Sequence, residues 1–165
     1  MRPRIIAVDG LGGAGKSSLA EHLAHELEAP IVHTDDFASW DNPIEWWPDV
    51  IEKVLRPIAA GLSARYRPTS WGGPAKPEVV VEPAGFLLLE GVSASCEAFQ
   101  PYLVYSIWIE TPRAVRLRRG LQRDGEHARA NWDRWMAEED TYVERERPAS
   151  RADAVLPGDA DMWAS

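Results

Sequence analysis

Short apolar runs recur along the chain, separated by stretches in which the apolar positions follow a helical period. The clearest runs are residues 5–8, 30–33, 85–91 and 103–109. The run at 85–91 has no charged position until Glu90, as expected for a central parallel strand that is buried on both faces. After the first run, Leu19, Leu23 and Leu27 share one face of a helix. Strands that alternate with helices predict an α/β fold in which helices wrap a parallel sheet.

The remaining predicted elements carry weaker signals. Residues 49–60 have helical spacing, with a bend at Pro57 and Gly61 as the cap. Residues 78–82 and 152–156 predict short strands, and Thr111-Pro112 begins a further helix. The last long helix ends near Pro148 and carries an apolar stripe, which predicts core packing rather than a cofactor pocket. This stripe consists of Trp132, Trp135, Met136, Tyr142 and Val143.

The first apolar run leads into a glycine-rich segment, Gly10-Leu11-Gly12-Gly13-Ala14-Gly15-Lys16-Ser17. The glycines let the backbone point its N–H groups inward as an anion-binding nest, which the N-terminus of the next helix reinforces. Lys16 supplies a positive charge for the β- and γ-phosphates, and the Ser17 hydroxyl is placed to ligate Mg²⁺. A strand before this phosphate loop (Walker A motif) and a helix after it predict a nucleoside triphosphate site. The predicted nucleotide-binding residues are Gly10, Gly12, Gly13, Ala14, Gly15, Lys16, Ser17 and Ser18.

Composition narrows the classes of protein. With 165 residues, the chain is long enough for one domain with a substantial core, and we expect a single domain over residues 1–165. The formal net charge of −8 argues against a nucleic-acid binder, because clustered Lys and Arg hold phosphate backbones. No apolar segment has the length of a signal peptide or a membrane span, so we expect a cytoplasmic protein. Cys96 is the only cysteine, which excludes an internal disulfide and predicts a small buried hydrophobe.

Acidic residues follow two of the predicted strands. Asp35 and Asp36 come after the run at 30–33, at the strand end where open parallel sheets bind ligands. One of them would accept the proton of a substrate hydroxyl, and the other would bind substrate or a Mg²⁺-bound water. A helix cap or turn is the alternative use of such aspartates. Glu90 emerges at the same sheet edge as the phosphate loop and would orient Mg²⁺ or its water shell. The predicted metal-site residues are Ser17, Asp36 and Glu90.

Tryptophans and turn residues mark a predicted acceptor side at about residues 35–77. The segments 38–48 and 66–77 are loops by their Pro, Asn, Asp and Gly content. Tryptophans in such loops either fill the core or stack on a substrate ring. The candidate substrate-binding residues are Asp35, Asp36, Phe37, Trp40, Trp47 and Trp71.

Arginines gather between residues 113 and 129. Arg116, Arg119 and Arg123 lie on one face of a helix by their spacing. Asp124-Gly125 then breaks the helix, which favours a lid of about residues 116–130 that closes on a triphosphate. A solvated basic face would have the same spacing. We expect at least one of these arginines to contact phosphate or adenine, and we single out Arg119 and Arg123.

With these residues in place, the chain resembles the uridine kinase-like family of P-loop kinases, which includes nucleoside, nicotinamide riboside and pantothenate kinases. The likeness follows Asp35-Asp36-Phe37, Glu90-Gly91 and the arginine-rich segment 116–124 in the family's order. It implies a five-stranded parallel sheet of order 2-3-1-4-5 sandwiched by helices, with Asp35 as the catalytic base. The chain departs from the family at Ala38, where a Tyr is usual, and at 66–71, where uridine kinases have their substrate segment.

We therefore expect an ATP- and Mg²⁺-dependent kinase that phosphorylates a hydroxyl of a small uncharged metabolite such as a nucleoside. The predicted catalytic residues are Lys16, Asp35, Arg119 and Arg123. Two alternatives stay open. A nucleoside monophosphate kinase would use Arg65 and Arg67 for the acceptor phosphate, and a nucleotide-binding regulatory module would show little turnover. We expect a monomer or homodimer with no nucleic-acid or membrane partner; the acceptor and the choice between ATP and GTP stay open.

Overall fold

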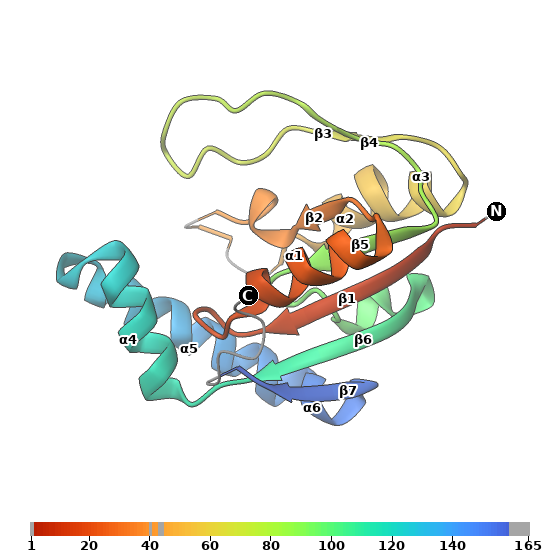
Figure 1. Ribbon diagram of the computed structural model, residues 1–165. Coiled ribbons are helices and arrows are strands. Elements are labelled where there is room, and N and C mark those ends of the chain that lie inside the picture. Colours follow the sequence, from red (N-terminus) through yellow and green to blue (C-terminus); the bar gives the residue numbers. More distant parts are fainter. Residues whose placement is uncertain (1, 40, 43–44, 159–165) are drawn as a thin grey trace.

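The fold is built on a sheet of five parallel strands (Figure 1), seen in a computed structural model that describes residues 2–39, 41–42 and 45–158. Strand β1 (Arg4–Gly10) lies at the centre, between β5 (Phe86–Glu90) and β6 (Leu103–Glu110). Strands β2 (Ile31–His33) and β7 (Ala154–Pro157) form the two edges. Numbered along the chain, these five strands are arranged 2-3-1-4-5, so the predicted α/β fold and strand order are confirmed.

Helices cover both faces of this sheet (Figure 1). Helix α1 (Lys16–Leu27) packs Leu19 and Ala20 on one face, against Val8, Ile107 and Ile109. The other face carries a helical segment made of α2 (Trp47–Val50), η2 (Ile51–Leu55) and α3 (Arg56–Ala59). The 3₁₀ helix η3 (Glu97–Tyr102), α5 (Arg129–Glu146) and α6 (Pro148–Arg151) complete that layer. Successive residues of β1 therefore alternate between two separate cores, as the period of a strand requires.

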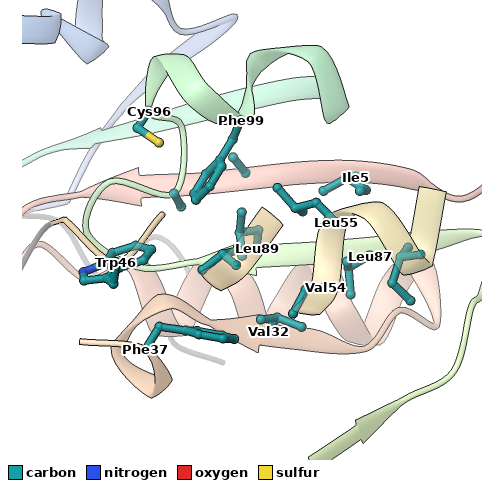
Figure 2. Close-up of a cluster of buried hydrophobic side chains, with 14 of the residues drawn as sticks. Ile5, Val32, Phe37, Trp46, Val54, Leu55, Leu87, Leu89, Cys96 and Phe99 are labelled. Carbon is teal, nitrogen blue, oxygen red and sulfur yellow. The ribbon is translucent and has the colours of Figure 1, made fainter. Parts of the chain in front are cut away.

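The larger core lies under the helical segment 47–59 (Figure 2). Leu87 and Leu89 of β5 and Val54 and Leu55 of η2 are at most 1% exposed, and Figure 2 shows them facing one another. Phe99 of η3 fills the space above β1. Cys96 is free and buried beside this ring, as expected for a small apolar residue.

The segment predicted as a helix over 49–60 contains a π-helical turn at its centre, η2. Pro57 lies in the first turn of α3. Because proline has no N–H to donate to the carbonyl four residues earlier, the regular α-helical ladder is interrupted before it. The bend expected at Pro57 is thus a change of helix type over the preceding turn.

A small antiparallel hairpin stands apart from the main sheet. Its strands are β3 (Ala64–Tyr66) and β4 (Val79–Val81), which pair Ala64 with Val81 and Tyr66 with Val79. The sequence predicted β4 but placed 64–66 next to a loop without a strand. The run Ala-Arg-Tyr has only three residues, which is too short an alternation to be recognised as a strand from the sequence alone.

Helix α4 (Arg113–Asp124) and the start of α5 lie beyond the carboxyl edge of the sheet (Figure 1). Helix α4 ends at Gly125, whose φ of 90° only glycine adopts without strain, and the short η4 (Glu126–Ala128) leads into α5. The 3₁₀ turn η1 (Thr34–Asp36) follows β2 at the same edge. None of the helices in the described ranges is long and apolar enough to span a membrane.

The packing of β5 generates a stability prediction. Leu89 is 0% exposed, so Leu89→Ala should lower the free energy of unfolding by about 2–5 kcal/mol through lost burial and a cavity. Leu62 is 63% exposed, and Leu62→Ala should change it by less than about 0.5 kcal/mol. Urea unfolding followed by circular dichroism measures both; equal effects would contradict this core.

Candidate active site

The phosphate loop between β1 and α1 has the backbone that its glycines predict. Gly13 and Gly15 have φ angles of 78° and 100°, a region that side chains disfavour. A Cβ on Gly13 would also lie 2.5 Å from the carbonyl oxygen of Arg116. Lys16 is 8% exposed, and its Nζ donates to the Leu11 carbonyl at 2.9 Å. The loop therefore folds back on the Lys16 ammonium group. This cradle fits a polyphosphate.

The carboxylate of Asp9, at the end of β1, anchors the start of this loop. It is 0% exposed and accepts five hydrogen bonds. The donors are the N–H groups of Gly10 and Ser93, both the N–H and hydroxyl of Ser95, and the Tyr142 hydroxyl on α5, the last at 2.6 Å. Burial raises the pKa of Asp9, and the donors from Ser95, Tyr142 and Gly10 oppose that rise. Asp9 is not among the residues predicted for the site, although it is a charged residue directly before the first glycine of the loop.

A cavity of about 710 Å³ opens above the phosphate loop. Its floor contains Lys16, Ser17 and Ser18, and its acidic side contains Asp35 and Glu90. Six of the eight predicted nucleotide-binding residues and two of the predicted carboxylates therefore line one cavity, whereas Gly10 and Ala14 do not line it. The remaining lining residues in the described ranges are Gly12, Gly13, Gly15, Trp71, Val92, Arg119, Gly120, Arg123, Asp124, His127, Ala128, Asn131, Trp132 and Trp135.

The two carboxylates that line the cavity, Asp35 and Glu90, have different neighbours. Burial raises the pKa of Asp35; Lys16 opposes this rise and Glu90 adds to it. Glu90 is 6% exposed, and its Oε2 is hydrogen-bonded to His33 Nδ1 at 2.7 Å. This bond raises the pKa of His33. His33 therefore orients the carboxylate predicted to act on Mg²⁺, a role that the sequence did not reveal.

The loop of the β3–β4 hairpin binds the segment that carries Asp35. Thr69 N–H donates to the Asp36 carbonyl at 2.8 Å, and Thr69 Oγ1 donates to the Ala38 carbonyl at 2.5 Å. Trp71 Nε1 donates to the Asp35 carbonyl at 3.2 Å. The hairpin loop thus holds the backbone on both sides of the candidate base.

Three indoles form the aromatic wall, by which we mean Trp71, Trp132 and Trp135. The rings of Trp71 and Trp135 contact each other, with centroids 5.5 Å apart and planes at 45°. Trp132 packs on Gly120, where even a Cβ would overlap its ring. The predicted core packing holds for Trp132, which is 7% exposed, and for Trp135, which packs against the core, but both indoles also line the cavity. A helical stripe cannot distinguish a core from a cavity wall, since both are apolar.

The three lid arginines of α4 have different surroundings. Arg119 Nη1 donates to the Gly13 carbonyl at 3.1 Å, and its side chain lines the cavity. Arg123 also lines the cavity, with its guanidinium 5.7 Å from the centroid of the Trp132 ring and Nε 3.0 Å from Asp124 Oδ1. Arg116 is buried instead, with Nε donating to the Thr111 carbonyl at 3.1 Å. The helical spacing correctly places the three arginines on one face of α4, but it cannot show which of them α5 buries.

Three predicted substrate or metal residues in the described part of the chain, Asp36, Phe37 and Trp47, do not line this cavity. The Asp36 carboxylate accepts a hydrogen bond from the Tyr66 hydroxyl at 3.1 Å, and burial together with this carboxylate raises the pKa of Tyr66. Phe37 is 8% exposed and lies in the core, with its ring centroid 4.7 Å from that of Tyr66 (Figure 2). Trp47 is 40% exposed and borders a separate surface depression with Cys96 and Arg145. Trp40 lies outside the described residues.

The chain is similar to known proteins in its fold but matches no sequence family. No family model matches the chain, and no curated protein matches it. The fold is similar to a possible uridine kinase from Bacillus stearothermophilus, with a TM-score of 0.72 and 18% identity over 94% of this chain and 89% of that one. It is also similar to a candidate fructose transport system kinase of a Silicibacter species, with a TM-score of 0.74 and 19% identity over 94% and 90%. A sugar kinase from a Janibacter species follows at a TM-score of 0.58 and 16% identity over 96% and 87%.

The chain has the P-loop kinase fold. In this fold the phosphate loop follows β1, Asp35 follows β2 and Glu90 ends β5, so three neighbouring strands deliver them to one edge. The similarity at these identities concerns the fold, and the chemistry must be argued from the residues of this chain.

The His33–Glu90 contact generates a pH-dependent prediction. A raised folded-state pKa means that the stability from this contact is fully present below the ordinary histidine value of 6.5 and is lost as the pH rises through the folded value. In chelator-treated protein, NMR titration should place the His33 pKa above 6.5, and Glu90→Gln should lower it. The resonance is assigned with His33→Gln; a titration that Glu90→Gln leaves unchanged would contradict the assignment.

Proposed function

We propose that this protein is an ATP- and Mg²⁺-dependent kinase that transfers a phosphoryl group to a hydroxyl of a small uncharged metabolite. The observation that carries the proposal is that Asp35 and the Lys16 phosphate loop face each other across one cavity closed by an aromatic wall. Phosphoryl transfer needs these parts: a cradle for the donor, a base for the acceptor and walls that position both.

The residues present fit the nucleotide and its metal. The amides after Gly13 and the Lys16 ammonium would hold the β- and γ-phosphates, and Arg119 and Arg123 would approach them from α4. Ser17 and Glu90 would hold the ion, which neutralises charge on the phosphates. The described residues contain no cluster of three or more His, Cys, Asp or Glu that could hold a metal by themselves. Mg²⁺ keeps waters and phosphate oxygens as most of its ligands, so one or two protein ligands are enough to bind it.

Asp35 is suited to accept a proton from the acceptor hydroxyl. Its raised pKa makes the carboxylate a stronger base than an exposed aspartate. Lys16 favours the charged form and Glu90 disfavours it, so the two neighbours tune the same group from opposite directions.

The aromatic wall favours an acceptor with a flat or apolar face, because indoles supply broad contact area and few polar groups. A monophosphate acceptor would instead need cations at that end of the cavity. Arg65 is exposed and pairs with Glu78 at 3.5 Å, and Arg67 donates to the Lys76 carbonyl at 2.6 Å. Neither lines the cavity, which argues against the monophosphate kinase alternative.

Replacement of the candidate base is the central test. Asp35→Asn should lower kcat by at least about a hundredfold, because it removes the proton acceptor, while Mg·ADP binding changes little. Asp49→Asn removes a 63%-exposed carboxylate from α2 and should leave both unchanged. Product mass spectrometry and calorimetry measure the two quantities; full activity of Asp35→Asn would refute the role of this residue.

The acceptor is tested with ATP, Mg²⁺ and a panel of nucleosides, vitamins and sugars, with products identified by mass. We expect a product from an uncharged acceptor. Trp71→Leu should then raise the KM for that acceptor about tenfold, because an aromatic contact is lost, with little change in the KM for ATP. Products from monophosphates alone would support a nucleotide kinase, and nucleotide binding without any product would support a regulatory module.

A further inference from the structure

A buried carboxylate on α5 contacts the phosphate loop from its outer side. Glu139 is 1% exposed, and its Oε2 accepts the Gly12 N–H at 2.6 Å. The approach is close: a Cβ on Gly12 would lie 3.3 Å from this oxygen and 3.2 Å from the Trp132 ring. A negative charge beside a loop that binds anions is unfavourable unless it has another task.

The charge of Glu139 is balanced locally by Arg116. Arg116 Nη1 lies 3.7 Å from Glu139 Oε1, and the two side chains are 7% and 1% exposed. Within the described part of the chain, neither atom has a hydrogen-bond partner. The pair is therefore poorly optimised as an ion pair, whereas the bond to Gly12 is short and well formed. The Gly12 N–H thus makes a short hydrogen bond to Glu139, whereas the Arg116 guanidinium lies beyond hydrogen-bond distance.

Helix α5 connects this contact to both halves of the site. Tyr142, one turn after Glu139, donates to Asp9 at the start of the loop. Trp135, one turn before it, belongs to the aromatic wall. Helix α5 thus contacts Gly12 in the phosphate loop and Asp9 at the end of β1, and it also carries part of the aromatic wall.

We propose that Glu139 is a positioning residue, which holds the tip of the phosphate loop in its nucleotide-binding shape and fixes it relative to the aromatic wall. The inference rests on the proposed function insofar as the loop binds a nucleoside phosphate. Without an acceptor for Gly12 N–H, a loop containing Gly10, Gly12, Gly13 and Gly15 samples many more conformations, and binding must restrict them. Loss of the acceptor should therefore weaken nucleotide affinity.

The test compares two double variants that differ in whether the side chain at position 139 can accept a hydrogen bond. Arg116→Met/Glu139→Gln and Arg116→Met/Glu139→Met both remove the buried charge pair without leaving one charge unpaired. Only glutamine keeps an oxygen that can accept from Gly12. The probe is Mg·ADP, measured by calorimetry. We expect the Gln variant to bind within about threefold of the wild type and the Met variant about tenfold more weakly.

Urea unfolding of both variants separates this effect from a general loss of stability. Glu138 is the exposed neighbour of Glu139, and Glu138→Met should leave Mg·ADP affinity unchanged. If both double variants are folded and bind equally, the positioning role is refuted. If the wild type binds Mg·ADP but phosphorylates no acceptor, the kinase proposal fails while the comparison of the double variants still decides the role of Glu139.

Discussion

The buried carboxylate of Asp9 determines how the site is assembled. A carboxylate without contact to water is costly, and its five hydrogen-bond donors come from separate parts of the chain: the phosphate loop, the segment after β5 and helix α5. Each donor that moves away leaves the charge less compensated. One residue therefore couples the start of the phosphate loop, the segment that follows Glu90 and the helix that carries two indoles of the aromatic wall.

The parallel sheet supplies the rest of the arrangement. β2, β5 and β1 are neighbours and run in the same direction, so Asp35, Glu90 and the phosphate loop follow their carboxyl ends side by side. Packing at this edge is tight, since a Cβ on Gly91 would overlap the Thr34 hydroxyl. That hydroxyl in turn donates to the Val92 carbonyl at 3.1 Å. The buried Thr34 side chain thus links the backbone segment before the candidate base to the segment that follows the candidate metal carboxylate.

The sequence predicts those parts of the site whose residues are close together in the chain, and it does not predict side-chain contacts between distant segments. The phosphate loop is recognisable because its glycines, Lys16 and Ser17 are adjacent in the chain, and Leu87 and Leu89 identify a buried strand by composition. Phe37, Trp47 and Trp135 are different, because their surroundings are set by other elements: the core under η2, a surface depression, and the cavity. Glu139 offered one unused signal, a charge at a helical position between Met136 and Tyr142 on an otherwise apolar stripe. A polar residue there indicates a buried partner, but the sequence alone does not identify Gly12.

Under the proposed function, the hairpin loop would make acceptor recognition and catalysis dependent on each other. Trp71 offers its ring to the cavity and its Nε1 to the carbonyl of Asp35, so the same side chain touches the acceptor space and the backbone of the candidate base. Thr69 adds two hydrogen bonds to the residues that follow. A change in the wall that moves Trp71 would therefore also move the backbone of Asp35. In such an arrangement a new acceptor cannot be accommodated by reshaping the wall alone; the hairpin loop must keep its hydrogen bonds to the 35–38 segment while its indole is replaced.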